Sequence, residues 1–145
     1  MGTFGHSPAS HAANRMLTRQ LRRGRGPAFM QLLTVTGRRT GRSYTTPIVP
    51  LVTDRGRWLV SPYGEVNWVR NVRASGQATL SRGDTVETLR AIEVDPADAV
   101  PLLRAYLSKK PVGWIVRSQF RFGPRSSDAE IAREAVRHPV FEVVS

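Results

Sequence analysis

A basic loop enclosed by two apolar segments constrains the fold of this chain most strongly. The run Phe29–Val35 is apolar, the loop from Thr36 to Ser43 reads TGRRTGRS, and an alternating segment follows over Tyr44–Val52. This order predicts a β-hairpin with a basic tip, in which glycines allow tight turning or close approach of another group. Guanidinium groups at such a tip can each bind phosphate or carboxylate through two hydrogen bonds. The pattern indicates either a site for a multiply anionic ligand or a solvated basic turn.

Positive charge is concentrated in the N-terminal third of the chain. The 145 residues carry a formal net charge of +11, with 22 Lys and Arg against 11 Asp and Glu. Residues 1–53 hold eight arginines and no acid, so they account for +8 of the excess. Such a segment attracts an anionic partner, and the candidates are a small acidic molecule, a lipid surface and a nucleic acid.

Several classes of site are excluded by composition. The chain has no cysteine, and two of its three histidines, His6 and His11, lie near the N-terminus. Disulfides, thiolate metal sites and a cysteine nucleophile are therefore excluded, and no metal site is predicted. His138 precedes Pro139 at the start of a predicted strand, where we expect a structural role. No apolar run is long enough to span a membrane, and residues 1–30 lack a signal-peptide core, so we expect a cytoplasmic protein.

Short antiparallel strands dominate the predicted elements, which indicates an α+β fold around a small sheet or barrel. The predicted strands are 29–35, 44–53, 57–61, 77–81, 85–94 and 138–144. The predicted helices are 11–23, 67–74, 96–107 and 127–136, with a short helix or a lid over 113–122. Pro47 and Pro50 place the second strand at an edge or a bulge. We expect residues 1–10 to be disordered, residues 1–26 to form a basic tail and helix, and residues 27–145 to form one domain.

A second group of candidate residues lies on the predicted helix 67–74 and just before it. The helix carries Trp68 and Asn71, and Tyr63 lies upstream. Together with the basic tip, these side chains can clamp a planar heterocycle that bears a phosphate, with the indole on the ring and the amide on a polar ring edge. The alternative is that Trp68 packs in the core and faces the sheet. No G-x-G-x-x-G or G-x-S-x-G motif supports a Rossmann or hydrolase site.

The segment Leu32–Val94 resembles the deazaflavin-dependent nitroreductase family. The resemblance is carried by the ordered pair T-G-R-x-T-G, at Thr36–Gly41, and W-x-x-N, at Trp68–Asn71. It implies a split β-barrel of the FMN-binding type, with about six mostly antiparallel strands and peripheral helices. It also implies coenzyme F420 as the cofactor, and transfer of a hydride from the reduced deazaflavin to a quinone, a nitroaromatic compound or another activated acceptor.

The resemblance also implies which residues form the site. The cofactor-binding residues would be Gly37, Arg38, Arg39, Thr40, Thr46, Pro47, Ser61, Trp68 and Asn71. Hydroxyl groups suited to proton delivery belong to Tyr44, Ser61 and Tyr63, since a tyrosine with its usual pKa near 10 is protonated at neutral pH. Tyr44 and Val49 depart from residues common in relatives, so the acceptor is not carried over. The aromatic segment 106–125 is the expected wall on the acceptor side.

Other functions remain open at this stage. The same fold could hold FMN or a haem in place of F420, and a non-catalytic basic module could bind nucleic acid or a membrane surface. Against nucleic acid, the charge collects in one loop and one helix rather than along a recognition element. We therefore predict no nucleic-acid partner. Contact with a membrane surface through the Arg15–Arg23 helix and formation of a homodimer are further expectations.

Overall fold

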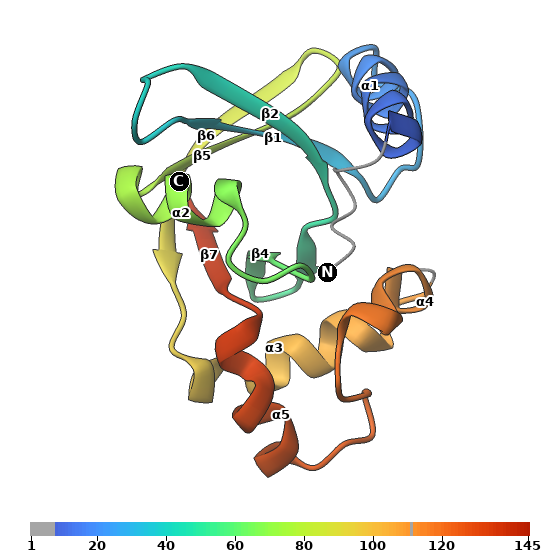
Figure 1. Ribbon diagram of the computed structural model, residues 1–145, viewed down its shortest axis with the longest axis vertical. Coiled ribbons are helices and arrows are strands. Elements are labelled where there is room, and N and C mark those ends of the chain that lie inside the picture. The colour runs from blue at the N-terminus through green and yellow to red at the C-terminus, as the bar shows by residue number, and fades with distance from the viewer. Residues whose placement is uncertain (1–7, 111) are drawn as a thin grey trace.

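Seven antiparallel strands form one sheet in the computed structural model, which describes residues 8–110 and 112–145. The strand order is β2-β1-β5-β6-β7-β4-β3, and every neighbouring pair is antiparallel (Figure 1). The strands are β1 (Gln31–Thr36), β2 (Ser43–Ile48), β3 (Leu51–Thr53), β4 (Gly56–Val60), β5 (Gln77–Arg82), β6 (Thr85–Glu93) and β7 (Val140–Val144).

The two edges of the sheet are joined directly, which forces the sheet to curl. β2 and β3 stand at opposite ends of the strand order, yet only Val49 and Pro50 separate them in the chain. Three peptide units reach about 11 Å at most, so the two ends of the sheet come close and leave an open, split barrel. The sequence predicts one strand over 44–53, and this prediction is wrong because Pro50 interrupts it. The edge position predicted from Pro47 is confirmed.

Successive side chains along the strands pack into two separate apolar clusters, one on each face of the sheet. Leu59 and Phe141 contribute to a cluster inside the barrel, which the helix α2 (Asn67–Ser75) completes. Their neighbours Trp58 and Val140 contribute instead to a second cluster beneath the C-terminal helices. This division follows from the strand period of two, which sends successive side chains to opposite faces.

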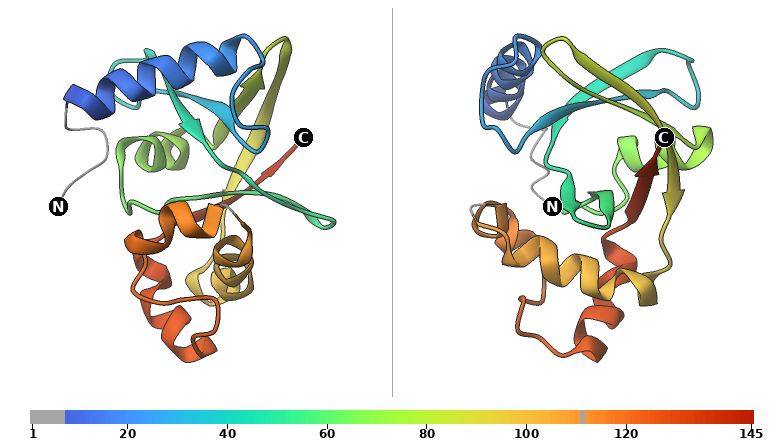
Figure 2. Two further views of the ribbon diagram at one scale, coloured as in Figure 1. Left: turned by 90° about the vertical axis from the view of Figure 1, so that its right-hand side faces the viewer. Right: turned by 180° about the vertical axis from the view of Figure 1, so that it is seen from behind.

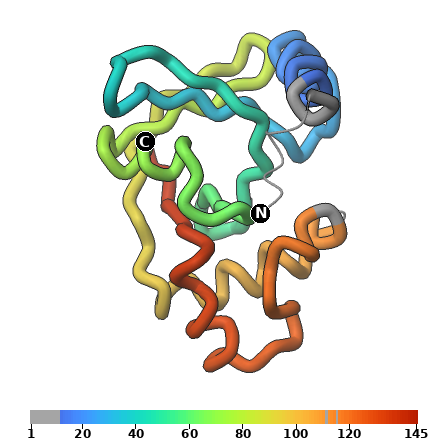
Figure 3. The backbone as a smooth tube through the Cα atoms, viewed as in Figure 1, coloured from blue at the N-terminus to red at the C-terminus, as the bar shows by residue number. Residues whose placement is uncertain are grey.

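The second cluster is covered by a helical layer inserted between β6 and β7. The backbone leaves the sheet after β6, runs through the layer and returns in β7, which pairs with β6 and β4 (Figure 3). The layer consists of α3 (Pro96–Ser108), α4 (Val112–Val116), η2 (Arg117–Gln119), α5 (Asp128–Glu134) and η3 (Ala135–Arg137). The short helix predicted within 113–122 is therefore confirmed.

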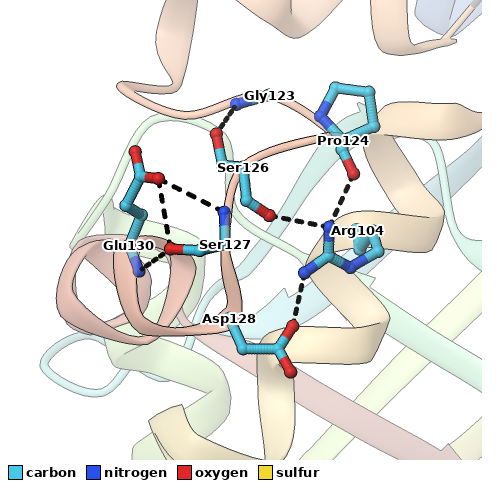
Figure 4. A network of polar contacts seen from close by, with 7 residues as sticks. All are labelled: Arg104, Gly123, Pro124, Ser126, Ser127, Asp128 and Glu130. Carbon is cyan, nitrogen blue, oxygen red and sulfur yellow. Dashed lines mark hydrogen bonds and ion pairs between the residues drawn. The ribbon is translucent and has the colours of Figure 1, made fainter.

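One arginine fastens this layer together. Arg104 of α3 donates hydrogen bonds to the carbonyl oxygens of Pro124, at 2.7 Å, and Ser126, at 2.8 Å, and forms an ion pair with Asp128 of α5 (Figure 4). Ser127 begins α5 with a capping box, in which its hydroxyl accepts from the N–H of Glu130 and the Glu130 side chain accepts from the N–H of Ser127. These contacts hold α3, the segment 124–126 and α5 of the layer together.

The N-terminal helix α1 (Pro8–Arg22) lies against the barrel, where it contacts β1, β2 and β5. Leu21 is fully buried, and Arg82 of β5 donates hydrogen bonds to carbonyl oxygens between residues 24 and 30.

Residues 8–10 are helical, so the predicted disorder of 1–10 does not hold there, while residues 1–7 lie outside the described residues. The domain boundary at residue 26 stays a prediction. No helix in the described ranges combines the length and apolarity needed to cross a membrane.

Candidate functional site

The β1–β2 hairpin ends in a structured basic tip, Gly37–Arg42. The N–H of Gly37 donates to the carbonyl of Arg42 at 2.7 Å, and the N–H of Gly41 donates to the carbonyl of Gly37 at 3.0 Å. Gly41 has a φ of +72°, a left-handed conformation that favours glycine. The side chains of Arg38, Arg39 and Thr40 are exposed. The tip thus presents its cations on a fixed backbone.

The ring of Tyr44 occupies the space beside Gly37. A Cβ atom at position 37 would lie 2.4 Å from Cε2 of Tyr44 and 3.0 Å from Oγ1 of Thr40. The hydroxyl groups of Thr40 and Tyr44 are 3.2 Å apart, so they share a hydrogen bond. The sequence predicts close approach of a ligand at Gly37, whereas the structure uses this space for an aromatic side chain of the next strand.

Asn71 joins the tip to α2. Its Oδ1 accepts a hydrogen bond from the backbone N–H of Arg38 at 3.0 Å and another from Nη1 of Arg38 at 2.8 Å. Asn71 is only 4% exposed, and a buried amide oxygen requires such partners. The guanidinium of Arg38 has further N–H donors that remain available to a ligand. Two residues that lie 33 positions apart are therefore brought together, as the predicted site requires.

Trp68 lies one helical turn before Asn71, and its side chain is partly buried in the core and partly exposed at the surface. Its ring centroid is 6.1 Å from that of Phe141, with the planes tilted by 57°, and the side chain is partly buried against the cluster inside the barrel. The sequence leaves open that Trp68 packs in the core. One part of the indole does so. The rest of the ring remains accessible beside α2.

The two predicted site residues on β2 face opposite ways. Because side chains alternate along a strand, Thr46 shares a face with Tyr44 and Ile48, which is buried in the cluster inside the barrel. Pro47 lies on the other face, in register with Leu32 of β1. The structure therefore groups Thr46 with the tip and α2, whereas Pro47 is directed away from them.

Ser61 differs from its expected role in binding and proton delivery. It is fully buried, and its hydroxyl donates to the carbonyl of Gly64 at 2.6 Å. Its own carbonyl accepts from Nδ1 of His138 at 3.1 Å, which fixes the tautomer because a carbonyl only accepts. Ser61 therefore shapes the 61–66 loop instead of facing a ligand.

His138 has the structural role that the sequence predicts. Its ring stacks on Phe120 with centroids 4.1 Å apart, and the residue is 5% exposed. Burial is the main influence on its ionisation and lowers the pKa of the His138 imidazole below its ordinary value. The neutral ring is thus part of the packing between β7 and the helical layer.

Two tyrosines lie where the 61–66 loop meets the helical layer. Tyr63 is half-buried, and desolvation raises the pKa of its phenol. Tyr106 of α3 is buried and donates to the carbonyl of Val49 at 3.3 Å, and burial together with the nearby Tyr63 raises the pKa of Tyr106 well above its usual range. Both phenols stay protonated at neutral pH. Of the aromatic residues expected on the acceptor side, Tyr106 and Phe120 are buried in the core, and only Trp114 is exposed.

The tip arginines differ from other arginines in their partners. The five ion pairs found within residues 8–110 and 112–145 involve Arg57, Arg73, Arg104 and Arg137, and none involves the tip. Arg73 binds both Glu65 and Glu93, which lowers the pKa of Glu65 and makes this loop acid a structural anchor. A cavity of about 120 Å³ lies beside this triad, on a side of α2 that Arg38 and Trp68 do not line.

A comparison of the sequence with models of protein families finds one matching family. Residues 11–120 match the model of a family described as F420H(2)-dependent quinone reductase. The matched range covers about three quarters of the chain and includes most of α1, the tip, α2 and α4. No curated protein matches the chain.

Solved structures share the fold at low sequence identity. A structure described as a domain-swapped dimer is 17% identical with a TM-score of 0.56, covering 94% of this chain and 99% of that chain. A structure of an F420-H2 dependent reductase, FDR-A, is 19% identical with a TM-score of 0.53, covering 79% and 93%. A nimc/nima family protein from Clostridium acetobutylicum is 8% identical with a TM-score of 0.52, covering 88% and 81%. These similarities confirm the predicted α+β split barrel.

Proposed function

Because the chain belongs to the F420H(2)-dependent quinone reductase family, we propose that the hairpin tip and α2 together form its cofactor site. The chain is a deazaflavin-dependent oxidoreductase, and its cofactor is coenzyme F420. The observation that carries the site proposal is the pair of hydrogen bonds from Arg38 to Asn71, which fixes a cation of the tip against the helix that bears Trp68.

The chemistry of the tip fits this cofactor. Coenzyme F420 has an anionic tail of phosphate and carboxylate groups, and such groups prefer planar guanidinium donors. Arg38 and Arg39 are exposed and take no part in the ion pairs of the described residues. We assign the anionic tail to these two arginines, with Thr40 as an additional hydroxyl donor. Gly37 and Asn71 act by positioning the tip, the former through Tyr44 and the latter through Arg38.

The remaining residues of the site would orient the ring and shield it from water. Thr46 and Tyr44 share the β2 face that leads into the barrel, and Trp68 borders it from α2. When bound and reduced, the deazaflavin supplies a hydride to the acceptor. Reduction of a quinone to a hydroquinone also requires one proton at the second oxygen, and we assign this proton to the phenol of Tyr63 or of Tyr44. Water then restores the phenol proton.

A quinone is the acceptor that we favour, since the family is described by this activity. A nitroaromatic compound is the second candidate, which the resemblance to nitroreductases supports. Val49 is partly buried against the cluster beneath the C-terminal helices, and its carbonyl accepts a hydrogen bond from the Tyr106 hydroxyl.

A homodimer is a further part of the proposal. β2 is an edge strand of the sheet, and an edge with unpaired backbone groups can pair with a second copy. One structure of similar fold is described as a domain-swapped dimer. Light scattering after size-exclusion chromatography measures this directly, and a mass of one chain, about 16.1 kDa, would contradict it. Cytoplasmic location stays a prediction.

Reconstitution with separate cofactors tests the proposed function. Under anaerobic conditions, protein and reduced F420 are mixed with menadione or with a nitroarene, and recovery of the fluorescence of oxidised F420 reports turnover. We expect protein-dependent turnover with F420 and none when reduced FMN replaces it. Protein with Arg39→Ala, which alters the proposed cofactor site, should turn over more slowly at limiting F420. Turnover with FMN alone, or binding of haem alone, would contradict the proposal.

A further inference from the structure

An exposed tryptophan stands out in the helical layer. Trp114 of α4 is 73% exposed, more than any other large apolar side chain in the described part of the chain. Tryptophan ordinarily buries most of its large surface. A single exposed apolar residue is unremarkable, but tryptophan is enriched at interfaces where one end of its ring is apolar and the other is wet.

The fold holds this indole outward. Val112 and Val116 are one helical turn apart and are buried in the cluster beneath α4, so residue 114 lies on the opposite side of the helix. Gly113 packs against the end of α3, since a Cβ there would lie 2.1 Å from the carbonyl oxygen of Leu107. The helix cannot rotate to bury Trp114 without breaking this contact.

A lysine contacts the indole, and the stretch of sequence around it holds no acid. Lys110 places its Nζ 5.2 Å from the centre of the Trp114 ring, a cation–π contact. Between residues 99 and 127 the sequence holds six basic residues and no acid. These basic residues are Arg104, Lys109, Lys110, Arg117, Arg121 and Arg125. All except Arg104 are exposed.

The N-terminal helix presents a similar surface on the same side of the molecule. Figure 2, in its left view, brings α1 and α4 to the viewer together. The outward residues of α1 include Arg15, Arg19 and Met16, which is 63% exposed, and no acid occurs in residues 1–53. Each helix therefore offers one apolar side chain among cations.

We propose that the face formed by α1 and α4 binds the surface of an anionic phospholipid bilayer, with Trp114 at the level of the headgroups. An indole is amphipathic and is favoured at the interface between lipid and water. Clusters of basic residues are attracted to anionic leaflets. A nucleic acid fits less well, because Lys110 covers the ring on which a base would stack. The proposal is independent of the redox activity.

Vesicle sedimentation with the full chain tests this proposal. Wild-type protein is mixed with vesicles of phosphatidylcholine alone or with one quarter phosphatidylglycerol, at low and high salt. We expect at least tenfold stronger partitioning to the anionic vesicles at low salt, and loss of this preference at high salt. Trp114→Ala should lower the partition coefficient about tenfold. Arg19→Gln with Lys110→Gln should lower it about 25-fold, since one basic residue near the surface contributes roughly fivefold.

A matched charge control and a position-specific readout complete the experiment. Arg55→Gln with Arg90→Gln removes the same charge from exposed positions on other elements and should change partitioning less than twofold. Brominated lipids should quench wild-type tryptophan fluorescence but not that of Trp114→Phe, in which Trp58 and Trp68 remain. Equal binding to both vesicle types, unchanged partitioning of Trp114→Ala, or binding to duplex DNA in place of vesicles would overturn the proposal.

Discussion

The side-chain oxygen of Asn71 accepts two hydrogen bonds from Arg38, one from its backbone and one from its guanidinium. A single buried amide thereby sets the position of the hairpin tip and the direction of its first arginine. Because Trp68 stands on the same helix, the contact also fixes the distance between the cation of the tip and the indole. The proposed cofactor site is consequently organised by a residue that need not touch the cofactor.

Removal of this amide should loosen the tip and weaken cofactor binding together. Asn71→Ala leaves Arg38 without its buried acceptor, and we expect the free energy of unfolding to fall by about 1.5–3 kcal/mol, as for a hydrogen bond to a charged group. The affinity for F420 should fall in parallel. Urea unfolding and a fluorescence titration measure the two effects. Asn67→Ala, at an exposed position of the same helix, is the control, and a result equal to this control would refute the positioning role.

Gly37 and Tyr44 should be energetically coupled. Gly37→Ala places a Cβ where the Tyr44 ring now lies, and overpacking of this kind costs about 1–3 kcal/mol. In the background of Tyr44→Ala the same change should cost much less, because the ring that it displaces is absent. A double-mutant cycle in urea measures the coupling. Additive effects of the two substitutions would show that the ring does not occupy this space.

The phenol of Tyr63 should contribute to turnover without contributing to cofactor affinity. Tyr63→Phe removes the protonated donor, and loss of a positioned acid typically lowers kcat about 100-fold. Steady-state reduction of menadione gives kcat, and the titration with F420 should stay unchanged. Tyr106→Phe is the matched control, since it removes the buried hydroxyl that binds Val49 and should affect stability alone. If Tyr44→Phe abolishes turnover and Tyr63→Phe does not, the donor is Tyr44.

Acidification should destabilise the protein through His138. Burial lowers the pKa of His138 in the folded state, so the unfolded chain takes up this proton first as the pH falls. The free energy of unfolding should therefore decline from about pH 7 towards pH 5, until the folded-state pKa is also passed. Urea unfolding at several pH values measures this slope. His138→Gln should flatten it within the same window, and an unchanged slope would show that another group is responsible.

Local signals in the sequence were sufficient for much of the fold. Glycines at the tip and alternation in the flanking strands each act over a few residues, and the corresponding elements are present. The split of the second strand follows from Pro50, which was recognised as an edge or bulge residue but not as the end of a strand. The seventh strand is the result.

Contacts between distant residues could not be derived from the sequence in the same way. Asn71 and Arg38 were both predicted in the site, but their hydrogen bonds depend on the packing of α2 against β1. Thr46 and Pro47 face opposite ways by strand alternation, but only the pairing with β1 shows which of the two faces the cluster inside the barrel. Ser61 is predicted to bind the cofactor and to deliver a proton, but it is buried and its hydroxyl donates to the carbonyl of Gly64. Exposure and register are properties of the folded chain.

The central claim, that the basic tip binds the anionic part of coenzyme F420, is tested most directly by one fluorescence titration. F420 is titrated with wild type, Arg38→Ala, Arg39→Ala and the control Arg90→Ala, an exposed arginine on β6. Loss of a charged hydrogen bond costs about 1.5–3 kcal/mol, so each tip variant should raise Kd about 10- to 100-fold, and the control less than twofold. Wild-type affinity in both tip variants would contradict the account.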